Sequence, residues 1–235
     1  MKEFNNRYYY IKKGLSAFAL ALFVASVVSY RLEKKYSIPR GLETLYYNNR
    51  GFYDEPVFKE LEEKIDLKNA KIEELSPNRK NYSIEWEGYL FIEEAGVYEF
   101  TTASDDGSVI FVDDILVVDN GGFHSLREVS GEIFLLPGFH SIWIRYCQGE
   151  GADTLLFKAF KQAQKQSSIS KKQFFPSIPP LRALRIEQRV ETYTRVVYYA
   201  WGIGILSLAA IWLLIKRRRV GGKKVPSSKQ SPPGT

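Results

Sequence analysis

Cysteine and histidine are both scarce in this sequence, and each shortage excludes a class of protein. The 235 residues include one cysteine, Cys147, so a disulfide-stapled scaffold is excluded. The two histidines, His124 and His140, offer little for acid–base or nucleophilic catalysis. The chain also lacks a GxSxG elbow, an HExxH metal motif and a phosphate-cradling glycine loop. We therefore expect a protein that is not an enzyme.

Acidic charge is missing from the C-terminal end of the sequence. Residues 216–235 carry seven Lys and Arg and no acid, and residues 1–13 carry four basic side chains and one acid. Residues 31–195 hold 22 basic and 26 acidic side chains, a net charge of −4, although the whole chain has +6. The middle therefore has no excess of basic charge for binding nucleic acid, and we expect no nucleic-acid partner. Basic ends around an acidic middle favour a membrane protein whose ends face the cytoplasm.

The apolar residues, 45% of the chain, concentrate partly in two runs without charge. The first run, residues 14–30, is at the short limit for crossing a bilayer. A cleaved signal peptide is the alternative, because the run follows basic residues and has small residues near Ser26 and Ser29. The run is longer than the usual signal-peptide centre of about 7–15 residues. We therefore expect a retained transmembrane helix or signal anchor.

The second run, residues 196–215, is a stronger transmembrane pattern. It has 20 uncharged residues, with aromatic side chains towards both ends, and the basic cluster at 216–219 follows directly. This cluster predicts a cytoplasmic C-terminus, so residues 1–13 and the basic, disordered tail 216–235 are expected inside. The chain would cross the cell membrane twice, with the segment between the spans outside the cytoplasm. It would cross once if residues 1–30 are cleaved.

Short runs rich in β-branched and aromatic residues dominate the segment between the two apolar runs. They alternate with polar residues and are separated by turn signals such as Asp105-Asp106-Gly107 and Asn120-Gly121. This pattern predicts an all-β fold, an antiparallel β-sandwich over residues 36–162. The stretch 56–65 is expected to be a short helical turn, or a loop that carries Val57, Phe58 and Leu61 into the core. Residues 163–195 are predicted to be a stalk and a juxtamembrane helix.

The order of these signals resembles a known family, the protective-antigen fourteen-kilodalton (PA-fourteen) domain, over residues 41–160. Four segments carry the resemblance: GLETLYYNN (41–49), YSIEWEGYLFIEEAGVYEF (82–100), TTASDDGSVIFVDDILVVDN (101–120) and LLPGFHSIWIRYCQGEGADTLLF (135–157). The chain departs from the family at Asp114, where a glycine is usual, and in the loop 148–153, which lacks the asparagine of the sugar-binding members. The resemblance implies a β-sandwich found in toxins, glycosidases and adhesins.

The resemblance also implies a binding site. In the sugar-binding members, two adjacent aspartates joined by a cis peptide hold one Ca²⁺, which coordinates vicinal sugar hydroxyls, and a late loop completes the metal shell. Ca²⁺ takes six to eight hard oxygens, and neighbouring carboxylates supply several of them. The implied metal ligands here are Asp105, Asp106, Glu150 and Asp153. The implied ligand-binding residues are Asp119, Asn120, His124 and Gln148.

Other interpretations of these residues stay open. Asp105-Asp106-Gly107 is also a good tight turn, Asn120-Gly121 is another, and His124 is then an exposed loop residue. Asp113 and Asp114 are expected at the centre of a hairpin rather than at a metal. Aromatic residues in the strands are expected in the core rather than as sugar platforms. These are Trp86, Tyr89, Tyr98 and Trp143.

Two functions follow from these observations. In the first, the protein is a membrane-anchored, cell-surface module that binds a surface glycan or polysaccharide, with calcium as its cofactor. In the second, it is a structural subunit that packs against an integral membrane protein, with its two spans paired in lipid. Small residues favour helix pairing. These are Ala17, Ala21 and Ala25 in the first run and Gly202, Gly204 and Ser207 in the second.

Overall fold

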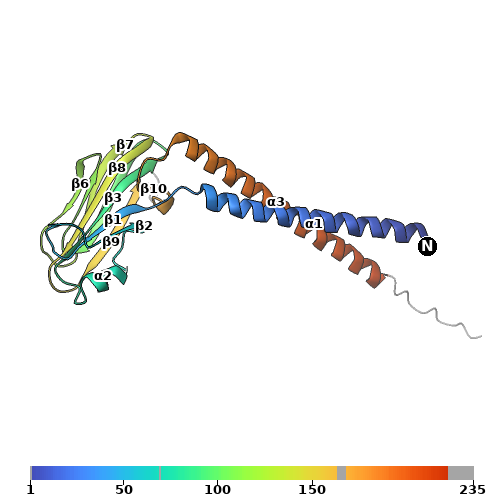
Figure 1. The fold of residues 1–235 in the computed structure, drawn as a ribbon, viewed down its shortest axis with the longest axis horizontal. Coiled ribbons are helices and arrows are strands. Elements are labelled where there is room, and N and C mark those ends of the chain that lie inside the picture. The colour runs from blue at the N-terminus through green and yellow to red at the C-terminus, as the bar shows by residue number, and fades with distance from the viewer. Residues whose placement is uncertain (1, 69, 163–167, 222–235) are drawn as a thin grey trace, which may run out of the picture. The chain divides into compact units, whose positions relative to one another are not determined.

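The chain contains two compact units, a β-sheet unit over Ile38–Pro180 and a unit of two long helices (Figure 1). The computed structural model describes residues 2–68, 70–162 and 168–221. The β-sheet unit has two antiparallel sheets. The larger sheet has the order β2-β1-β3-β8-β5-β6, with β10 also pairing with β3, and the smaller has the order β7-β4-β9.

The elements of the β-sheet unit are, in chain order, β1 (Leu42–Tyr47), β2 (Phe58–Glu62), α2 (Ala70–Leu75), β3 (Tyr82–Ile92), β4 (Gly96–Asp105), β5 (Ser108–Val112), β6 (Ile115–Asn120), β7 (Arg127–Leu135), β8 (Gly138–Gln148), β9 (Thr154–Lys161), η2 (Lys171–Gln173) and β10 (Phe174–Phe175).

The hydrophobic core lies between the two sheets. Alternate residues of a strand point to opposite faces, and Ile84 and Trp86 of β3 are fully buried, as is Ile144 of β8. The smaller sheet contributes Phe100 of β4 and Ala159 of β9 to the same cluster. The predicted all-β sandwich is therefore confirmed, since both sheets share one apolar core.

The centre of the stretch 56–65 forms a strand, β2, so the prediction of a helical turn or a core loop is wrong. Phe58–Glu62 pairs antiparallel with β1 at one edge of the larger sheet. Phe58 packs against the core, whereas Val57 and Leu61 are each 48% exposed. Pairing with β1 provides hydrogen bonds for the backbone N–H and C=O groups of this stretch. The local pattern of charged and apolar residues does not predict such a pairing.

The predicted hairpin at Asp113 and Asp114 is confirmed. Val112 of β5 pairs with Ile115 of β6, so the two aspartates are the whole loop. Their φ angles are 50° and 62°, and two-residue hairpin loops with positive φ at both positions match the twist of the strands.

Residues 168–175 take part in the β-sheet unit, beyond the boundary expected from the sequence. Phe174 and Phe175 are buried and pair with Leu90 and Tyr89 of β3. The preceding turn is closed by Ser170, whose hydroxyl accepts a hydrogen bond from the Lys172 N–H. The compact unit therefore runs to Pro180 rather than ending at 162, and two adjacent phenylalanines explain why this polar segment returns to the sheet.

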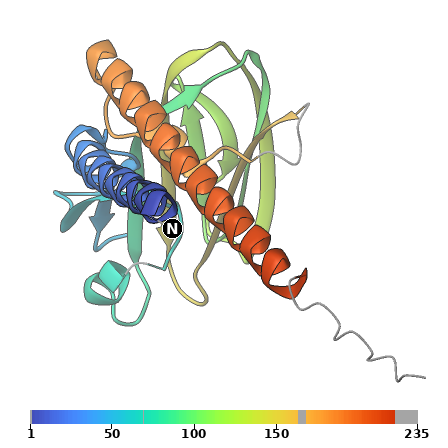
Figure 2. The same ribbon diagram turned by 90° about the vertical axis from the view of Figure 1, so that its right-hand side faces the viewer.

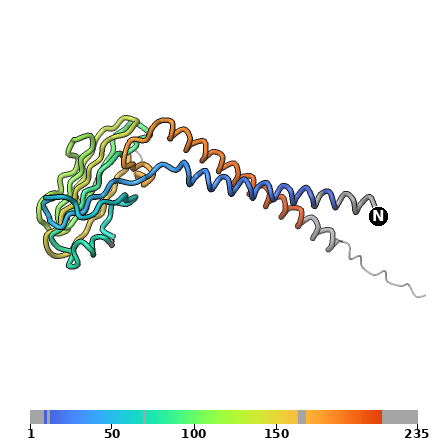
Figure 3. The backbone as a smooth tube through the Cα atoms, in the orientation of Figure 1, coloured from blue at the N-terminus to red at the C-terminus, as the bar shows by residue number. Residues whose placement is uncertain are grey.

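The second unit consists of α1 (Lys2–Tyr36) and α3 (Leu181–Gly221). Among the described residues, both helices contain a stretch long and apolar enough to cross a membrane, Lys13–Tyr36 and Leu181–Leu213. Each helix is continuous (Figures 2 and 3), so the predicted helix at 181–195 does run into the second apolar run.

Hydroxyl groups join the two helices. The Ser29 and Thr194 hydroxyls are 2.6 Å apart and buried, and the Trp201 indole N–H donates to Ser26 Oγ at 2.8 Å. The helices therefore pair. Of the small residues expected to mediate the contact, Gly204 lies close to α1, since an added Cβ would be 3.7 Å from the Phe18 ring. Ala17 and Ala21 are exposed, and an added Cβ at Gly202 would have no neighbour within 4 Å.

Replacing Phe174 by alanine should destabilise the protein by about 3–5 kcal/mol, because the ring is 5% exposed and part of the core. The control is Phe134→Ala, which removes the same ring from a site that is 62% exposed. Urea denaturation of the full chain in detergent measures the stability of both variants. Equal stability of the two variants would show that the segment contributes nothing to the core.

Stability should fall at alkaline pH. Burial raises the pKa of Tyr82 and of Tyr146, and burial and a hydrogen bond to Glu85 raise the pKa of Tyr47 to about 12. An unfolded phenol ionises near pH 10, so the stabilisation is complete below about pH 10 and is lost as pH rises towards about 12. Urea denaturation across that range tests this. Tyr82→Phe should flatten the decline, and Tyr53→Phe, at a site 72% exposed, should leave it unchanged.

Candidate functional site

Three loops meet at the buried carboxylate of Asp106. This residue lies in the turn between β4 and β5 and is 6% exposed. One of its oxygens, Oδ1, accepts a hydrogen bond from the His124 N–H at 3.0 Å, in the loop after β6. The other, Oδ2, accepts one from the Gly149 N–H at 2.8 Å, in the loop after β8. A single anion thus holds the three loops together.

Gln148 braces the same turn from inside. Its Oε1 accepts a hydrogen bond from the Asp106 N–H at 3.1 Å, and its Nε2 donates to the Ala152 carbonyl at 3.2 Å. The Tyr146 hydroxyl lies 2.5 Å from the Asp105 carbonyl oxygen and 2.8 Å from Gln148 Oε1. The peptide between Asp105 and Asp106 is cis, as the family resemblance implies. Gln148, predicted to bind ligand, is fully buried and supports the turn.

Gly107 allows the loops to approach closely. A Cβ at this position would lie 2.5 Å from the Gly122 carbonyl oxygen and 3.1 Å from Cys147 Sγ. The first distance is far inside van der Waals contact with backbone, so a side chain would force the loop after β6 away from the turn.

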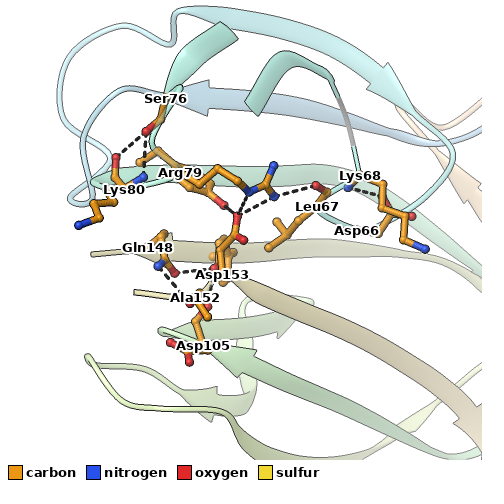
Figure 4. Close-up of polar contacts among 12 residues, drawn as sticks. Asp66, Leu67, Lys68, Ser76, Arg79, Lys80, Asp105, Gln148, Ala152 and Asp153 are labelled. Atoms are coloured by element: carbon orange, nitrogen blue, oxygen red, sulfur yellow. Dashed lines mark hydrogen bonds and ion pairs between the residues drawn. The ribbon is translucent and has the colours of Figure 1, made fainter. Parts of the chain in front are cut away.

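The two carboxylates of the late loop have other roles. Asp153 Oδ2 accepts hydrogen bonds at 2.6 Å from both Arg79 Nε and the Tyr82 hydroxyl. In Figure 4 the Asp153 side chain points to Arg79, whereas Asp105 points away from it. Glu150 is 75% exposed, and its carboxylate is 3.9 Å from Lys80 Nζ. Neither carboxylate joins the Asp105–Asp106 pair.

The four predicted calcium ligands therefore do not form one cluster. Within the described ranges, no group of three or more His, Cys, Asp or Glu side chains is placed to hold a metal ion. Asp105 is half-buried, and its carboxylate makes no hydrogen bond or ion pair with a described residue. Asp105 and Asp106 would supply two carboxylate ligands, whereas a full calcium shell needs six to eight oxygens. Calcium binding at Asp105 and Asp106 stays a prediction.

The predicted rim residues divide into buried and accessible ones. Asn120 is fully buried: its amide donates to Ser104 Oγ and its oxygen accepts from Arg127 Nε at 2.7 Å. Asp119 is exposed and accepts a hydrogen bond from the Gly121 N–H at 3.1 Å. His124 is half-buried, with Nε2 3.0 Å from the Asn120 carbonyl oxygen. Only Asp119 and His124 of this group present side-chain surface to solvent.

Phe123 is a site residue that the sequence interpretation missed. Its ring is 60% exposed and lies against Gly149, where an added Cβ would be 3.3 Å from the ring. The guanidinium of Arg50 stacks over the ring, 4.7 Å from its centre. A phenylalanine within the polar turn sequence NGGFH was the available signal. The ring gives the loop site an apolar surface beside the carboxylates.

Comparison with known proteins agrees with this architecture. The PA14 domain family model matches residues 39–168. The anti-sigma-I factor RsgI3 of Acetivibrio thermocellus is 29% identical over 143 residues, which are 60% of this chain and 22% of that protein. The chain therefore spans less than a quarter of this relative.

Two solved structures have similar folds. An anti-sigma factor domain-containing protein is 28% identical with a TM-score of 0.52, and the match covers 61% of this chain and 50% of that one. The PA14 domain of the MpAFP antifreeze protein has a TM-score of 0.51 at 15% identity, covering 60% of this chain and 93% of that domain. None of these three names describes an enzyme.

The family match covers more than half of the chain and coincides with the β-sheet unit that carries the loop site. PA14 is the short name of the protective-antigen family that the sequence resembles. This chain belongs to the PA14 domain family.

Proposed function

We propose that this protein is a membrane-anchored PA14 module that binds surface carbohydrate outside the cytoplasm. The observation that carries the proposal is the convergence of three loops at Asp106, which leaves the Asp105 carboxylate without a partner among the described residues. Binding sites commonly combine a preformed apolar surface with a few converging polar groups. The exposed Phe123 ring supplies the apolar surface.

The chemistry of a sugar suits this arrangement. The C–H groups of a pyranose ring can pack on Phe123, and its hydroxyls can donate charge-assisted hydrogen bonds to Asp105. Asp106 holds the loops in position and does not itself need to touch the sugar. Calcium between Asp105 and Asp106 would add a second way to hold vicinal hydroxyls, and the experiment below separates the two.

The membrane part of the proposal is supported by the two helices and by charge. The apolar stretches Lys13–Tyr36 and Leu181–Leu213 flank the PA14 module, and basic residues lie at both ends of the chain. By the positive-inside rule both ends face the cytoplasm and the module lies outside. Several copies in one membrane would raise the effective concentration of a weak sugar site.

A second candidate function is interaction with a protein partner in the membrane. The names of the two relatives near 28% identity, both anti-sigma factors, support it. In this alternative the module packs on an integral membrane protein and binds no glycan. Stable co-purification of one such protein, with no glycan binding, would favour this alternative over the first.

Asp105→Asn should weaken glycan binding at least tenfold, because it replaces charge-assisted hydrogen bonds with neutral ones. A glycan array selects the ligand, and calorimetry on the full chain in nanodiscs measures affinity without a sugar-headed detergent. The control is Asp66→Asn, which keeps the hydrogen bond that Asp66 Oδ1 accepts from the Lys68 N–H.

The same titration with EDTA tests calcium. Loss of binding in EDTA supports a metal-bridged sugar, and unchanged binding supports direct contact with Asp105. Absence of glycan binding by the unmodified protein would overturn the carbohydrate proposal.

Labelling of single cysteines should report the membrane topology. In a Cys147→Ser background, an impermeant maleimide should label Ser125→Cys in intact cells, because Ser125 is exposed in the PA14 module. Ser227→Cys, in the basic tail, should react only after the membrane is permeabilised. Labelling of the tail in intact cells would contradict the proposed orientation. An N-terminal epitope retained in the mature protein would show that residues 1–30 are not cleaved.

A further inference from the structure

A cavity lies on the larger sheet, away from the loop site. It has a volume of about 380 Å³ and is lined by residues of β1, β3, β5 and β8 and by the turn after β5. Its walls include three aromatic rings and three carboxylates: Tyr89, Phe111, Trp143, Glu43, Glu87 and Asp114. This volume falls within the range of small-molecule sites.

The cavity is on the outer face of the sandwich. On β3 the buried residues Trp86 and Leu90 point to the core, and the half-buried Glu87 and Tyr89 alternate with the core positions. Trp143 of β8 is half-buried in the same way. The expectation that Tyr89 and Trp143 belong to the core is therefore wrong, because both line the outer cavity instead.

Stacking holds the Trp143 ring in place. The ring centre is 5.4 Å from that of Phe111, with 33° between the ring planes. The Arg145 guanidinium lies 4.6 Å from the Trp143 ring centre and 3.8 Å from that of Phe52. Arg145 is itself held by Glu85, 2.8 Å from Arg145 Nε. The aromatic wall is thus preorganised, which lowers the entropic cost of binding a ligand.

Polar groups at this wall lack partners. Within the described residues, the Glu87 carboxylate and the Tyr89 hydroxyl make no hydrogen bond or ion pair, and the buried Trp143 indole N–H has no acceptor. Burial and the nearby carboxylates of Glu85 and Glu43 raise the pKa of Glu87. A half-buried carboxyl group without partners gains most from a ligand that brings hydrogen-bond donors.

We propose that this outer-face cavity binds one glycosyl unit of a neutral or amino sugar. The sugar's C–H face packs on Trp143, and its hydroxyls donate to Glu87 and accept from Tyr89. The carboxylates of Glu43, Glu87 and Asp114 disfavour uronic acids. The inference rests on the proposed carbohydrate function but uses different residues from the loop site.

A peptide fits the cavity less well. Peptides that bind β-sheets commonly add a strand to a free edge, and β3 and β8 are each paired on both sides within the larger sheet. The cavity also lies across β1, β3, β5 and β8 rather than along one strand. A single pyranose ring needs neither a free edge nor length.

The Trp143 indole signal tests the proposal directly. The chain has four tryptophans, so ¹⁵N-tryptophan-labelled full chain in nanodiscs gives few signals, and Trp143→Phe identifies the one of interest. Neutral, amino-sugar and uronate oligosaccharides are titrated. The Trp143 signal should shift with the first two classes and not with uronates. Glu87→Gln should weaken binding about tenfold, whereas Glu128→Gln, an exposed match on β7, should not.

The outcomes separate the two sites. If Glu87→Gln and Trp143→Ala lower affinity while Asp105→Asn does not, the outer cavity holds the sugar and the loop-site proposal fails. If Asp105→Asn abolishes binding and the Trp143 signal never moves, the loop site stands alone and the cavity proposal is overturned. A Trp143 shift caused only by peptides would also overturn it. If Trp143→Ala fails to fold, the affinity of Glu87→Gln and the Trp143 indole signal of the unmodified protein still show whether the cavity binds sugar.

Discussion

The loop site depends on one buried anion that accepts hydrogen bonds from two different loops. The Asp106 carboxylate binds the backbone N–H groups of His124 and Gly149, while its own backbone N–H donates to Gln148. Such charge-assisted hydrogen bonds are stronger than neutral ones. Here they hold together loops that have few apolar contacts. Because Asp106 is used in this way, its neighbour Asp105 is the carboxylate left for a ligand.

The β-sheet unit supports two separate surfaces in different ways. At one end, loops that connect the two sheets are held by hydrogen bonds and position Asp105 and Phe123. On the outer face of the larger sheet, strands position Glu87 and Trp143 through regular alternation, with backbone pairing on both sides. Sites built on strands are held more rigidly than sites on loops. The outer face is therefore the more preorganised surface, although the loop site contains the feature typical of the family.

Features set by neighbouring residues were predictable from the sequence, and features set by distant partners were not. The hairpin at Asp113 and Asp114 followed from two turn residues between two strand patterns, and positive φ at Asp114 explains why a glycine also suits that position. The role of Asp153 did not follow, because its partner Arg79 lies 74 residues away. The strand at Phe174 was equally hidden, since two residues carry no periodicity.

The hydroxyl contacts between α1 and α3 bear on whether the N-terminal segment is kept in the mature protein. Thr194 and Trp201 of α3 each find their partner in α1, at Ser29 and Ser26. Proteolytic removal of residues 1–30 would take both partners away from these α3 side chains. If the first helix is retained, it therefore supplies hydrogen-bond partners to the second.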